Sequence, residues 1–224
     1  ISDYEVFYGH ETGRIDLDFL LPDWFFVEDG FHAARLDRWG KRAIDVALSA
    51  IILLLFLPLL ICIGIAVKLE DGGPIFYGQE RVGRGGKIFK LTKFRSMRAD
   101  AEGDGTPRWT VEHDRRITRV GMVLRATHLD ELPQLWNVLR GDMSLVGPRP
   151  CVPEEFEHYA PHHMERLFVV PGVTGPWQVS GRNSVLDFEE VVRMDREYIR
   201  SWSLVRDLVI LVKTLPALYG RGVY

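Results

Sequence analysis

The longest apolar stretch of the chain lies in its first third. Residues 46–67 form 22 consecutive positions without a charged side chain, including the run IILLLFLPLLICIGIAV at 51–67. As an α-helix, this stretch would measure ~33 Å, which is enough to cross the hydrocarbon core of a bilayer. It lacks the polar stripe of a soluble core helix, and no cleavage-site pattern accompanies it. The pattern therefore predicts a membrane-inserted helix rather than a core helix or a signal peptide.

Basic residues on both sides of the stretch bear on how it enters the membrane. By the positive-inside rule, clusters of lysine and arginine mark a cytoplasmic end. Such residues precede the stretch at Arg35, Arg38, Lys41 and Arg42, and follow it at Lys68, Arg81, Arg84, Lys87, Lys90, Lys93, Arg95 and Arg98. Pro58, near the middle, removes a backbone hydrogen bond and favours a kink. We therefore expect a monotopic protein whose re-entrant helix over 39–70 bends at Pro58; a kinked helix that crosses once is the alternative.

The pattern beyond residue 70 predicts an α+β fold that is mainly helical with a small β-hairpin. Two strand-like segments, 71–83 and 86–94, flank a turn at Arg84–Gly85. Apolar residues recur at helical spacing over 129–139, and Gly141 is placed to end that helix. The other expected elements are a surface loop over 99–116, a helix over 153–168, a loop over 171–183 and an amphipathic helix from Phe188 through Lys213, whose pattern is compatible with an interruption near Ser201–Ser203.

Composition narrows the class of protein. With 224 residues, 26% charged and 46% hydrophobic, the chain is neither disordered nor of low complexity. Two cysteines, Cys62 and Cys151, cannot build a disulfide framework, which favours a reducing compartment. The sequence has no dense basic run and no zinc-finger or RNA-binding signature, so nucleic acid is a poor fit and is not expected as a partner.

The first 38 residues differ from the rest in charge. Residues 1–38 carry 9 acidic and 3 basic residues within a net charge of −3, and they are rich in aromatic side chains without a clear period. We interpret them as the end of a longer N-terminal region. The expected organisation is then this acidic segment over 1–38, the re-entrant helix over 39–70 and a folded domain over 71–224.

Asp130 and Glu131 are the most suggestive pair for chemistry. Pro133 fits only the first turn of a helix, which makes Asp130 a candidate N-cap and places both carboxylates where helix N–H groups favour anions. Ordinary helix capping is the structural alternative. His158 and His162 have a zinc-like spacing, but Pro161 argues against a regular helix between them. A hard cation such as Mg²⁺, held by a carboxylate and phosphate oxygens, fits this chain better.

Five basic residues are candidates for binding phosphate. Lys93 and Arg95 bracket one residue of a predicted strand, so both side chains are expected on one face. Arginine forks match phosphate oxygens, although each such residue taken alone is more often a solvated surface charge. The further candidates are Arg125, shortly before the acidic pair, Arg149 between two stiffening prolines, and Arg182 after a glycine in a predicted turn.

Several longer motifs together point to a family. They are KRAIDVALS at 41–49, DGGPIFYGQERVG at 71–83, KFRSM at 93–97, DELPQLWNVLRGDMSLVGPRP at 130–150 and PGVTGPWQVSGRN at 171–183. With these motifs the chain resembles the monotopic polyprenyl-phosphate phosphoglycosyl transferases, the bacterial sugar transferases, over about residues 38–224. The resemblance implies a re-entrant helix and a catalytic domain on the cytoplasmic face of the bacterial inner membrane.

The resemblance also implies a reaction. A hexose 1-phosphate passes from a UDP-sugar to undecaprenyl phosphate with Mg²⁺ as cofactor, UMP leaves, and exopolysaccharide or O-antigen assembly begins. Asp130 is then the nucleophile and a metal ligand, and Glu131 aids metal placement or proton handling. Galactose and glucose are the leading sugars, membrane lipids are expected partners, and a homodimer is left open.

Three positions depart from the family pattern, and two alternative functions remain. His128, Leu57 and Pro176 stand where other residue types are usual, which affects substrate detail rather than reaction type. One alternative is a membrane-anchored scaffold with a degenerate transferase fold, which the intact acidic pair and Arg149 disfavour. The other is a soluble phosphatase-like hydrolase, which the long apolar stretch disfavours.

Overall fold

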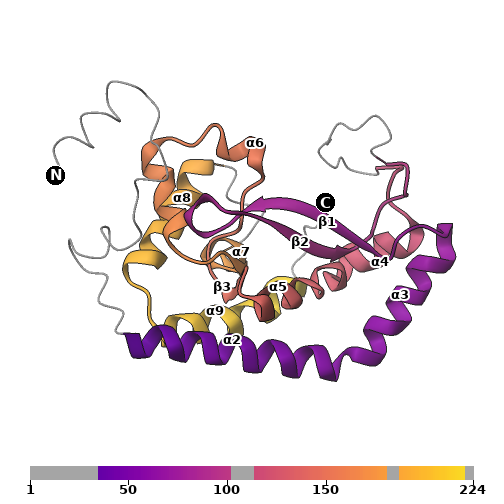
Figure 1. Ribbon diagram of the computed structural model, residues 1–224, viewed down its shortest axis with the longest axis horizontal. Helices are drawn as coiled ribbons and strands as arrows, with labels where there is room; N and C mark the ends of the chain where they lie inside the picture. The colour runs from indigo at the N-terminus through magenta and orange to yellow at the C-terminus, as the bar shows by residue number, and fades with distance from the viewer. Residues whose placement is uncertain (1–34, 102–113, 181–186, 220–224) are drawn as a thin grey trace. The chain divides into compact units, whose positions relative to one another are not determined.

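The computed structural model describes residues 35–101, 114–180 and 187–219 (Figure 1). By internal contacts the chain divides into two units, Ile1–His32 and Ala33–Tyr224, and all described residues belong to the second unit. Most of the acidic segment, most of the loop expected over 99–116, and Arg182 therefore lie outside the described residues.

The apolar stretch forms two helices joined at a bend. Helix α2 (Arg35–Leu55) and helix α3 (Leu57–Asp71) are separated by Phe56. Pro58 is the second residue of α3; because proline has no N–H and its ring clashes with the preceding turn, the two helices cannot continue as one straight helix. The expected bend is therefore present. No single helix within 35–101, 114–180 and 187–219 is long and apolar enough to span a bilayer. The two segments Trp39–Leu55 and Leu57–Asp71, bent by 63° relative to each other, have the required length and composition only when taken together.

The predicted hairpin is confirmed. Strand β1 (Phe76–Val82) pairs antiparallel with strand β2 (Ile88–Phe94), in a register that places Phe76 opposite Phe94 and Val82 opposite Ile88. A short 3₁₀ turn, η2 (Arg84–Gly86), connects the strands, and Gly85 and Gly86 adopt φ values of 67° and 76° that favour glycine. The turn thus falls at the expected residues.

The segment before Gly141 is more broken than its apolar period indicates. Helix α4 (Arg119–Thr127) ends at His128, which has a left-handed φ of 55°. A 3₁₀ turn, η3 (Leu129–Glu131), follows, and helix α5 (Gln134–Arg140) begins only after Pro133. The expectation that Asp130 caps this helix is wrong, because Pro133 occupies the N-cap position and Asp130 lies in the preceding turn. Gly141 ends α5 as predicted.

The C-terminal half contains a second strand pair that the pattern did not predict. Strand β3 (Ser144–Val146) runs parallel to strand β4 (Gly172–Thr174). Between them, the single helix expected over 153–168 is replaced by helix α6 (Pro153–Phe156) and the 3₁₀ helix η4 (Pro161–Phe168). Pro161 explains the break, since it forces the preceding residue into an extended conformation. The loop expected over 171–183 was wrong in part, because it contains β4 and helix α7 (Pro176–Val179).

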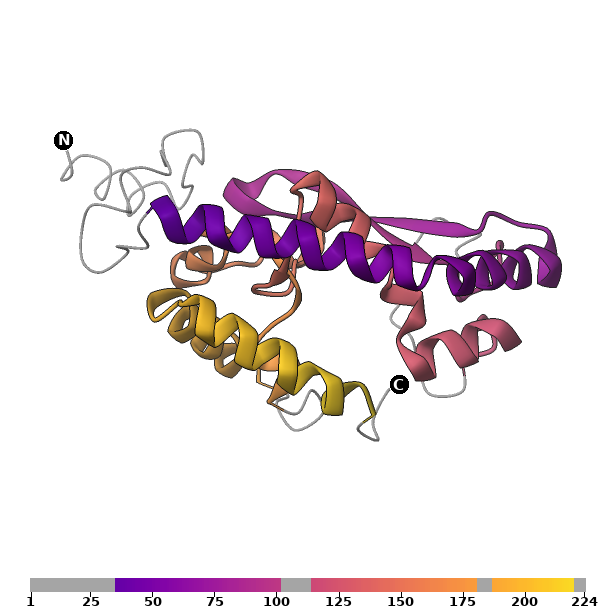
Figure 2. The ribbon, with the colours of Figure 1, turned by 90° about the horizontal axis from the view of Figure 1, so that it is seen from below.

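The last predicted helix is two helices. Helix α8 (Phe188–Arg200) and helix α9 (Leu204–Tyr219) are separated at Ser201–Ser203, where an interruption was compatible with the pattern, and α9 extends past Lys213. Figures 1 and 2 show α2 running along α5, β3 and α9. The predicted mainly helical fold with a small antiparallel strand pair is confirmed.

Two apolar clusters position the elements around the acidic pair. One joins α3, β2 and α4 through Ile63, Val67, Phe94 and Leu124. The other joins β1 to η4 through Val82, Cys151 and Leu167. Burial of these side chains fixes the hairpin between the end of α3 and the segment that follows β3.

Candidate active site

The acidic pair lies in the turn between α4 and α5. Asp130 is 8% exposed, and the left-handed conformation of His128 begins the turn that carries it. Lys93, on β2, donates from Nζ to Glu131 Oε1 at 2.8 Å. Arg125, in the last turn of α4, lies close enough to Asp130 for its charge to act on that carboxyl. The structure therefore brings two carboxylates and two cations from separate elements to one place.

The surroundings of Asp130 act on its ionisation in opposite directions. Burial, followed by the neighbouring charge of Glu131, raises the pKa of Asp130 to about 6, while Lys93 and Arg125 oppose that rise. Burial lowers the pKa of Arg125, and the charge of Asp130 counteracts this effect. A carboxylate that is stripped of water yet flanked by cations can stay ionised near neutral pH and attack an electrophile.

Ser96 orients Arg125. Its hydroxyl accepts a hydrogen bond from Arg125 Nε at 2.9 Å, and its backbone carbonyl accepts one from Thr118 N at 3.1 Å. Thr118 in turn caps α4 by accepting from the Gly121 N–H at 2.9 Å. The segment after β2 thus sets both the start of α4 and the guanidinium at its end.

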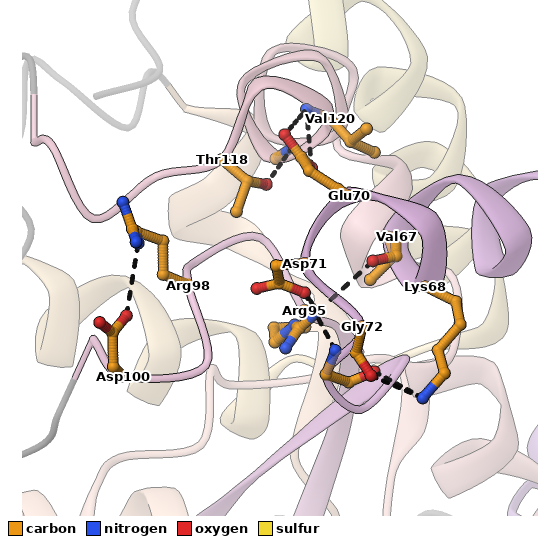
Figure 3. Close-up of polar contacts among 12 residues, drawn as sticks. Val67, Lys68, Glu70, Asp71, Gly72, Arg95, Arg98, Asp100, Thr118 and Val120 are labelled. Atoms are coloured by element: carbon orange, nitrogen blue, oxygen red, sulfur yellow. Dashed lines mark hydrogen bonds and ion pairs between the residues drawn. The ribbon is translucent and has the colours of Figure 1, made fainter.

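Arg95 lies with the end of α3. It is 6% exposed, forms an ion pair with Asp71, and donates from Nη2 to the Val67 carbonyl at 3.4 Å (Figure 3). Strand β2 ends at Phe94, so the alternation that would place Lys93 and Arg95 on one face ends there as well. Lys93 contacts Glu131, whereas the contacts of Arg95 are with α3.

Arg149 lies in the loop after β3, and its side chain forms no ion pair within the parts of the chain that the structure describes. Asp142, an acid in the same motif, does not pair with Arg149: its Oδ2 lies 3.7 Å from Arg140 Nε and accepts from Asn137 at 3.2 Å. The carbonyl of Arg149 accepts from Arg166 Nη2 at 3.2 Å.

Arg81, on β1, is a residue that sequence reasoning did not single out for the site. It donates from Nη1 to the Pro150 carbonyl at 3.0 Å and from Nη2 to Gln79 Oε1 at 2.7 Å. Burial lowers the pKa of Arg81, the nearby Arg149 lowers it further, and Glu131 is among the acids that raise it. Arg81 therefore binds the loop of Arg149, and the charge of Glu131 acts on it. Its place in the motif at 71–83 was the only signal for it.

A group of potential metal ligands lies elsewhere. His162, His163 and Glu189 form the one cluster of three such side chains found among residues 35–101, 114–180 and 187–219. Nδ1 of His163 accepts the Ala160 N–H at 3.0 Å, so its proton is on Nε2, which donates to Glu189 Oε1 at 2.9 Å. With that proton in place, Nε2 of His163 cannot bind a cation. His158 is not part of this group and bonds to the Glu154 carbonyl at 2.8 Å.

Comparison with known proteins places the chain in a family. The chain is 43% identical over 216 residues to the exopolysaccharide production protein ExoY of Rhizobium meliloti, covering 89% of this chain and 95% of that protein. It is 44% identical over 211 residues to the undecaprenyl-phosphate galactose phosphotransferase of Salmonella typhimurium, covering 86% of this chain but only 43% of that protein. A UDP-glucose:undecaprenyl-phosphate glucose-1-phosphate transferase of Caulobacter vibrioides is 43% identical over 185 residues, with 80% and 69% covered. Residues 36–221 match the bacterial sugar transferase family, to which the chain therefore belongs.

Proposed function

We propose that this chain transfers a hexose 1-phosphate from a UDP-sugar to undecaprenyl phosphate, with Asp130 as a covalent nucleophile. The observation that carries the proposal is the buried Asp130 carboxyl, placed beside Glu131 and between Lys93 and Arg125. The names of the Salmonella and Caulobacter relatives support undecaprenyl phosphate as acceptor, and that of the Caulobacter relative supports a UDP-sugar as donor.

The reaction divides into two displacements at one phosphorus atom. A carboxylate oxygen of Asp130 attacks the sugar-linked phosphorus of the UDP-sugar; an O–P bond to Asp130 forms, the bond to UMP breaks, and UMP leaves with the electron pair. A phosphate oxygen of undecaprenyl phosphate then attacks the same phosphorus, which releases the Asp130 carboxylate and forms the lipid diphosphosugar. Splitting one transfer into two steps lets soluble and lipid substrates use the same nucleophile in turn.

The cations around Asp130 have separate parts in this scheme. Lys93 and Arg125 keep Asp130 ionised against the effect of burial. Arg149, which forms no ion pair with the described residues, binds a phosphate of the donor and offsets the negative charge that grows on departing UMP. A planar guanidinium suits this contact, because its fork matches two phosphate oxygens.

A magnesium ion is consistent with the donor chemistry of the pair. Asp130 and Glu131 offer adjacent carboxylate oxygens, and Mg²⁺ is commonly held by one or two carboxylates together with substrate phosphates. The raised pKa of Asp130 reflects an unfavourable charge that a cation at the pair would offset. When bound, such an ion supplies electrostatic stabilisation of the transferring phosphoryl group.

The bent helix pair supports a re-entrant placement at the membrane. At the start of α2, Lys41 Nζ donates to the Val146 carbonyl at 3.0 Å, and at the end of α3, Asp71 pairs with Arg95. Both ends of the apolar pair therefore contact the same folded unit. Near the bend, Leu54 and Leu55 are 71% and 72% exposed, which favours an apolar environment around them. In this proposal, the catalytic unit lies at the cytoplasmic face of the bacterial inner membrane.

The decisive experiment looks for the covalent intermediate. Purified protein with a UDP-sugar and Mg²⁺, but without lipid, should release UMP in a single burst and show a phosphohexose adduct on a peptide that contains Asp130. Asp130→Asn should fold, but show neither adduct nor UMP release. Asp142→Asn, an acid in the same motif that is half-exposed, is the matched control and should behave as wild type.

Each alternative function predicts a different result. A scaffold would release no UMP, and a hydrolase would turn over continuously in the absence of undecaprenyl phosphate. Full turnover by a clean Asp130→Asn preparation would refute the covalent role.

A further inference from the structure

The loop that carries Arg149 is hydrogen-bonded at four successive carbonyls. Proceeding along the loop, Pro148, Arg149, Pro150 and Cys151 each accept one bond, from the Gly172 N–H at 2.9 Å, Arg166 at 3.2 Å, Arg81 at 3.0 Å and the Val82 N–H at 2.9 Å. The two prolines also restrict the backbone. Such a loop holds one backbone conformation, so the point from which the Arg149 side chain projects depends on the groups that bind that backbone.

Arg166 is the most constrained of these groups. Its Nε donates to Asp195 Oδ2 at 2.8 Å, its Nη1 to the Tyr159 hydroxyl at 2.6 Å and its Nη2 to the Arg149 carbonyl. The side chains of Arg166 and Asp195 are only 6% and 2% exposed. A buried ion pair is weak evidence for stability, because apolar residues of similar volume often serve as well. The three directed bonds point instead to a role in geometry.

The charges in this region show why such geometry is needed. Arg149 lies close enough to Arg81 for the charge of Arg149 to lower the pKa of Arg81. Neither arginine forms an ion pair within the described residues. Two like charges repel each other, so an unconstrained Arg149 would turn away until an anion arrived. Asp195 neutralises Arg166, which can therefore hold the Arg149 carbonyl without adding to that repulsion.

We propose that Arg166, held by Asp195 and Tyr159, is a positioning residue that fixes the Arg149 backbone and keeps the Arg149 guanidinium directed at the donor phosphate. The inference rests on the proposed function of Arg149. Arg166 itself does not touch the substrate and acts only through the carbonyl of Arg149.

Arg166→Lys is the primary test. Lysine keeps the charge opposite Asp195 but cannot reach three acceptors with a planar fork. We expect kcat for UMP release to fall about tenfold with a smaller rise in KM, because Arg149 binds the donor phosphate and this contact strengthens as UMP departs. Tyr159→Phe removes one of the three bonds and should lower kcat by a smaller factor. Arg200→Lys is the control, since Arg200 forms an exposed pair with Glu165 and should leave kcat unchanged.

A double-mutant cycle separates positioning from general destabilisation. If Arg166 acts through Arg149, then Arg166→Lys introduced into Arg149→Ala should lower kcat by less than about twofold, because the group it positions is gone. A structural effect would lower kcat by the same factor in both backgrounds, and that result would overturn the proposal. So would unchanged kcat in a folded Arg166→Lys variant.

The two proposals can fail separately. If Arg149→Ala alone leaves kcat unchanged, the proposed role of Arg149 fails, and the positioning role fails with it. If Arg149→Ala is impaired but the cycle is additive, only the positioning role fails. Should Arg166→Lys not fold, as judged by thermal denaturation, the same cycle is performed with Tyr159→Phe, and additivity there overturns the proposal in the same way.

Discussion

Asp130 has a carboxyl group whose ionised form is penalised by burial and supported by neighbouring cations. Because its pKa is about 6, the Asp130 carboxyl is mostly ionised at neutral pH, as a nucleophilic carboxylate must be. Without Lys93 and Arg125, burial and Glu131 would raise the pKa further. The chemistry of this residue is therefore sensitive to pH in a range where an exposed aspartate is not.

The pH dependence of the reaction follows from this value. We expect kcat/KM for the UDP-sugar to fall as pH decreases through about 6 where no cation occupies the pair, and at lower pH once Mg²⁺ is bound, because protonated Asp130 cannot attack phosphorus. Lys93→Met removes a cation that opposes the rise and should move the apparent pKa upward. Rates of UMP release, measured in both proteins from about pH 5 to about pH 8, test this prediction because that range brackets the pKa of Asp130. A profile that is flat across this range in wild type would contradict the prediction.

The raised pKa of Asp130 also affects stability, but in the opposite direction: activity increases with pH, whereas the contribution of Asp130 to stability decreases. The folded state holds the Asp130 proton up to about pH 6, whereas the unfolded chain releases it near 3.8. Between these values the folded state binds more protons, so the Asp130 contribution to the free energy of unfolding decreases as pH rises. Asp130→Asn removes this dependence, and we expect the variant to gain stability relative to wild type as pH rises from 4 to 7. Urea denaturation at several pH values measures the difference, and a parallel dependence in both proteins would contradict it.

Arg149 offers a comparison between charge and shape. Arg149→Lys retains the charge but loses the fork, and Arg149→Ala loses both, so we expect a graded decrease in kcat. By analogy with donors that stabilise a developing anion, the alanine variant should lose on the order of 2–4 kcal/mol of transition-state stabilisation. The measurement is kcat/KM together with the melting temperature of each preparation. A lowered melting temperature with kcat/KM near wild type would assign Arg149 to loop structure instead.

At the scale of elements, one buried carboxylate joins three helices. Asp207 of α9 accepts from Lys41 Nζ of α2 at 2.6 Å, from the Tyr198 hydroxyl of α8 at 2.6 Å and from Trp202 Nε1 at 3.1 Å. Lys41 also binds the carbonyl of Val146, the last residue of β3, so α2 is tied to the strand that leads into the Arg149 loop. Docking of the apolar helix pair is thus linked to the site through specific polar contacts.

Asp207→Asn tests how strongly these helices are joined. The amide can still accept a hydrogen bond, but it removes the carboxylate with which half-buried Lys41 forms its ion pair, leaving only the more distant charge of Asp45. We expect the free energy of unfolding to fall by about 1–3 kcal/mol, less than for a fully buried pair because Lys41 retains some solvent. Denaturant titration in detergent measures it. Arg193→Gln, which breaks an exposed pair with Glu190 on α8, is the control and should leave the midpoint unchanged; an equal loss in both variants would contradict the prediction.

Elements with strong local signals could be predicted from the sequence, and those that depend on distant partners could not. Pro58 and the turn at Arg84–Gly85 impose their conformations through their own chemistry. The strands β3 and β4 are three residues each, and they exist because Gly147 and Gly172 let two distant segments approach; a Cβ on Gly172 would lie 2.1 Å from Gly147 N. No local pattern encodes such a pairing.

The candidate site divides in the same way. Asp130 and Glu131 are adjacent in sequence, and Lys93 reaches them from a predicted strand. Arg166 pairs with Asp195, which lies in α8, 29 residues further along the chain. Its other acceptor, the Arg149 carbonyl, is brought within reach by the pairing of β3 with β4. Lys93 and Arg95 are two residues apart, which predicted that both side chains lie on one face of a strand. Arg95 instead pairs with Asp71, because α3 ends beside it.

Among the described residues, many of the exposed large apolar side chains belong to α2, α3 and α9, three helices that Figure 2 shows together. They include Ile51 and Leu55 of α2, Ile61 and Leu69 of α3, and Val205, Val212 and Leu215 of α9. An apolar surface of this extent is unfavourable in water and favours lipid contact. Because both ends of the α2–α3 pair contact the same unit, insertion of this pair requires none of its segments to leave on the opposite side of the membrane.

This topology can be tested by the accessibility of two engineered cysteines. Trp39, near the start of α2, is 75% exposed, and Asp100, beyond the end of α3, has a side chain that is 76% exposed. In a background with Cys62→Ser and Cys151→Ser, we expect Trp39→Cys and Asp100→Cys to react with a membrane-impermeant maleimide in inverted inner-membrane vesicles, and neither to react in intact spheroplasts. Both should react equally in detergent, which controls for burial by protein. A single crossing would place the two thiols on opposite sides, since a straight helix through 46–67 would separate its ends by ~33 Å. Labelling of Trp39→Cys in spheroplasts would therefore refute the re-entrant arrangement while leaving the chemistry of Asp130 to be judged on its own evidence.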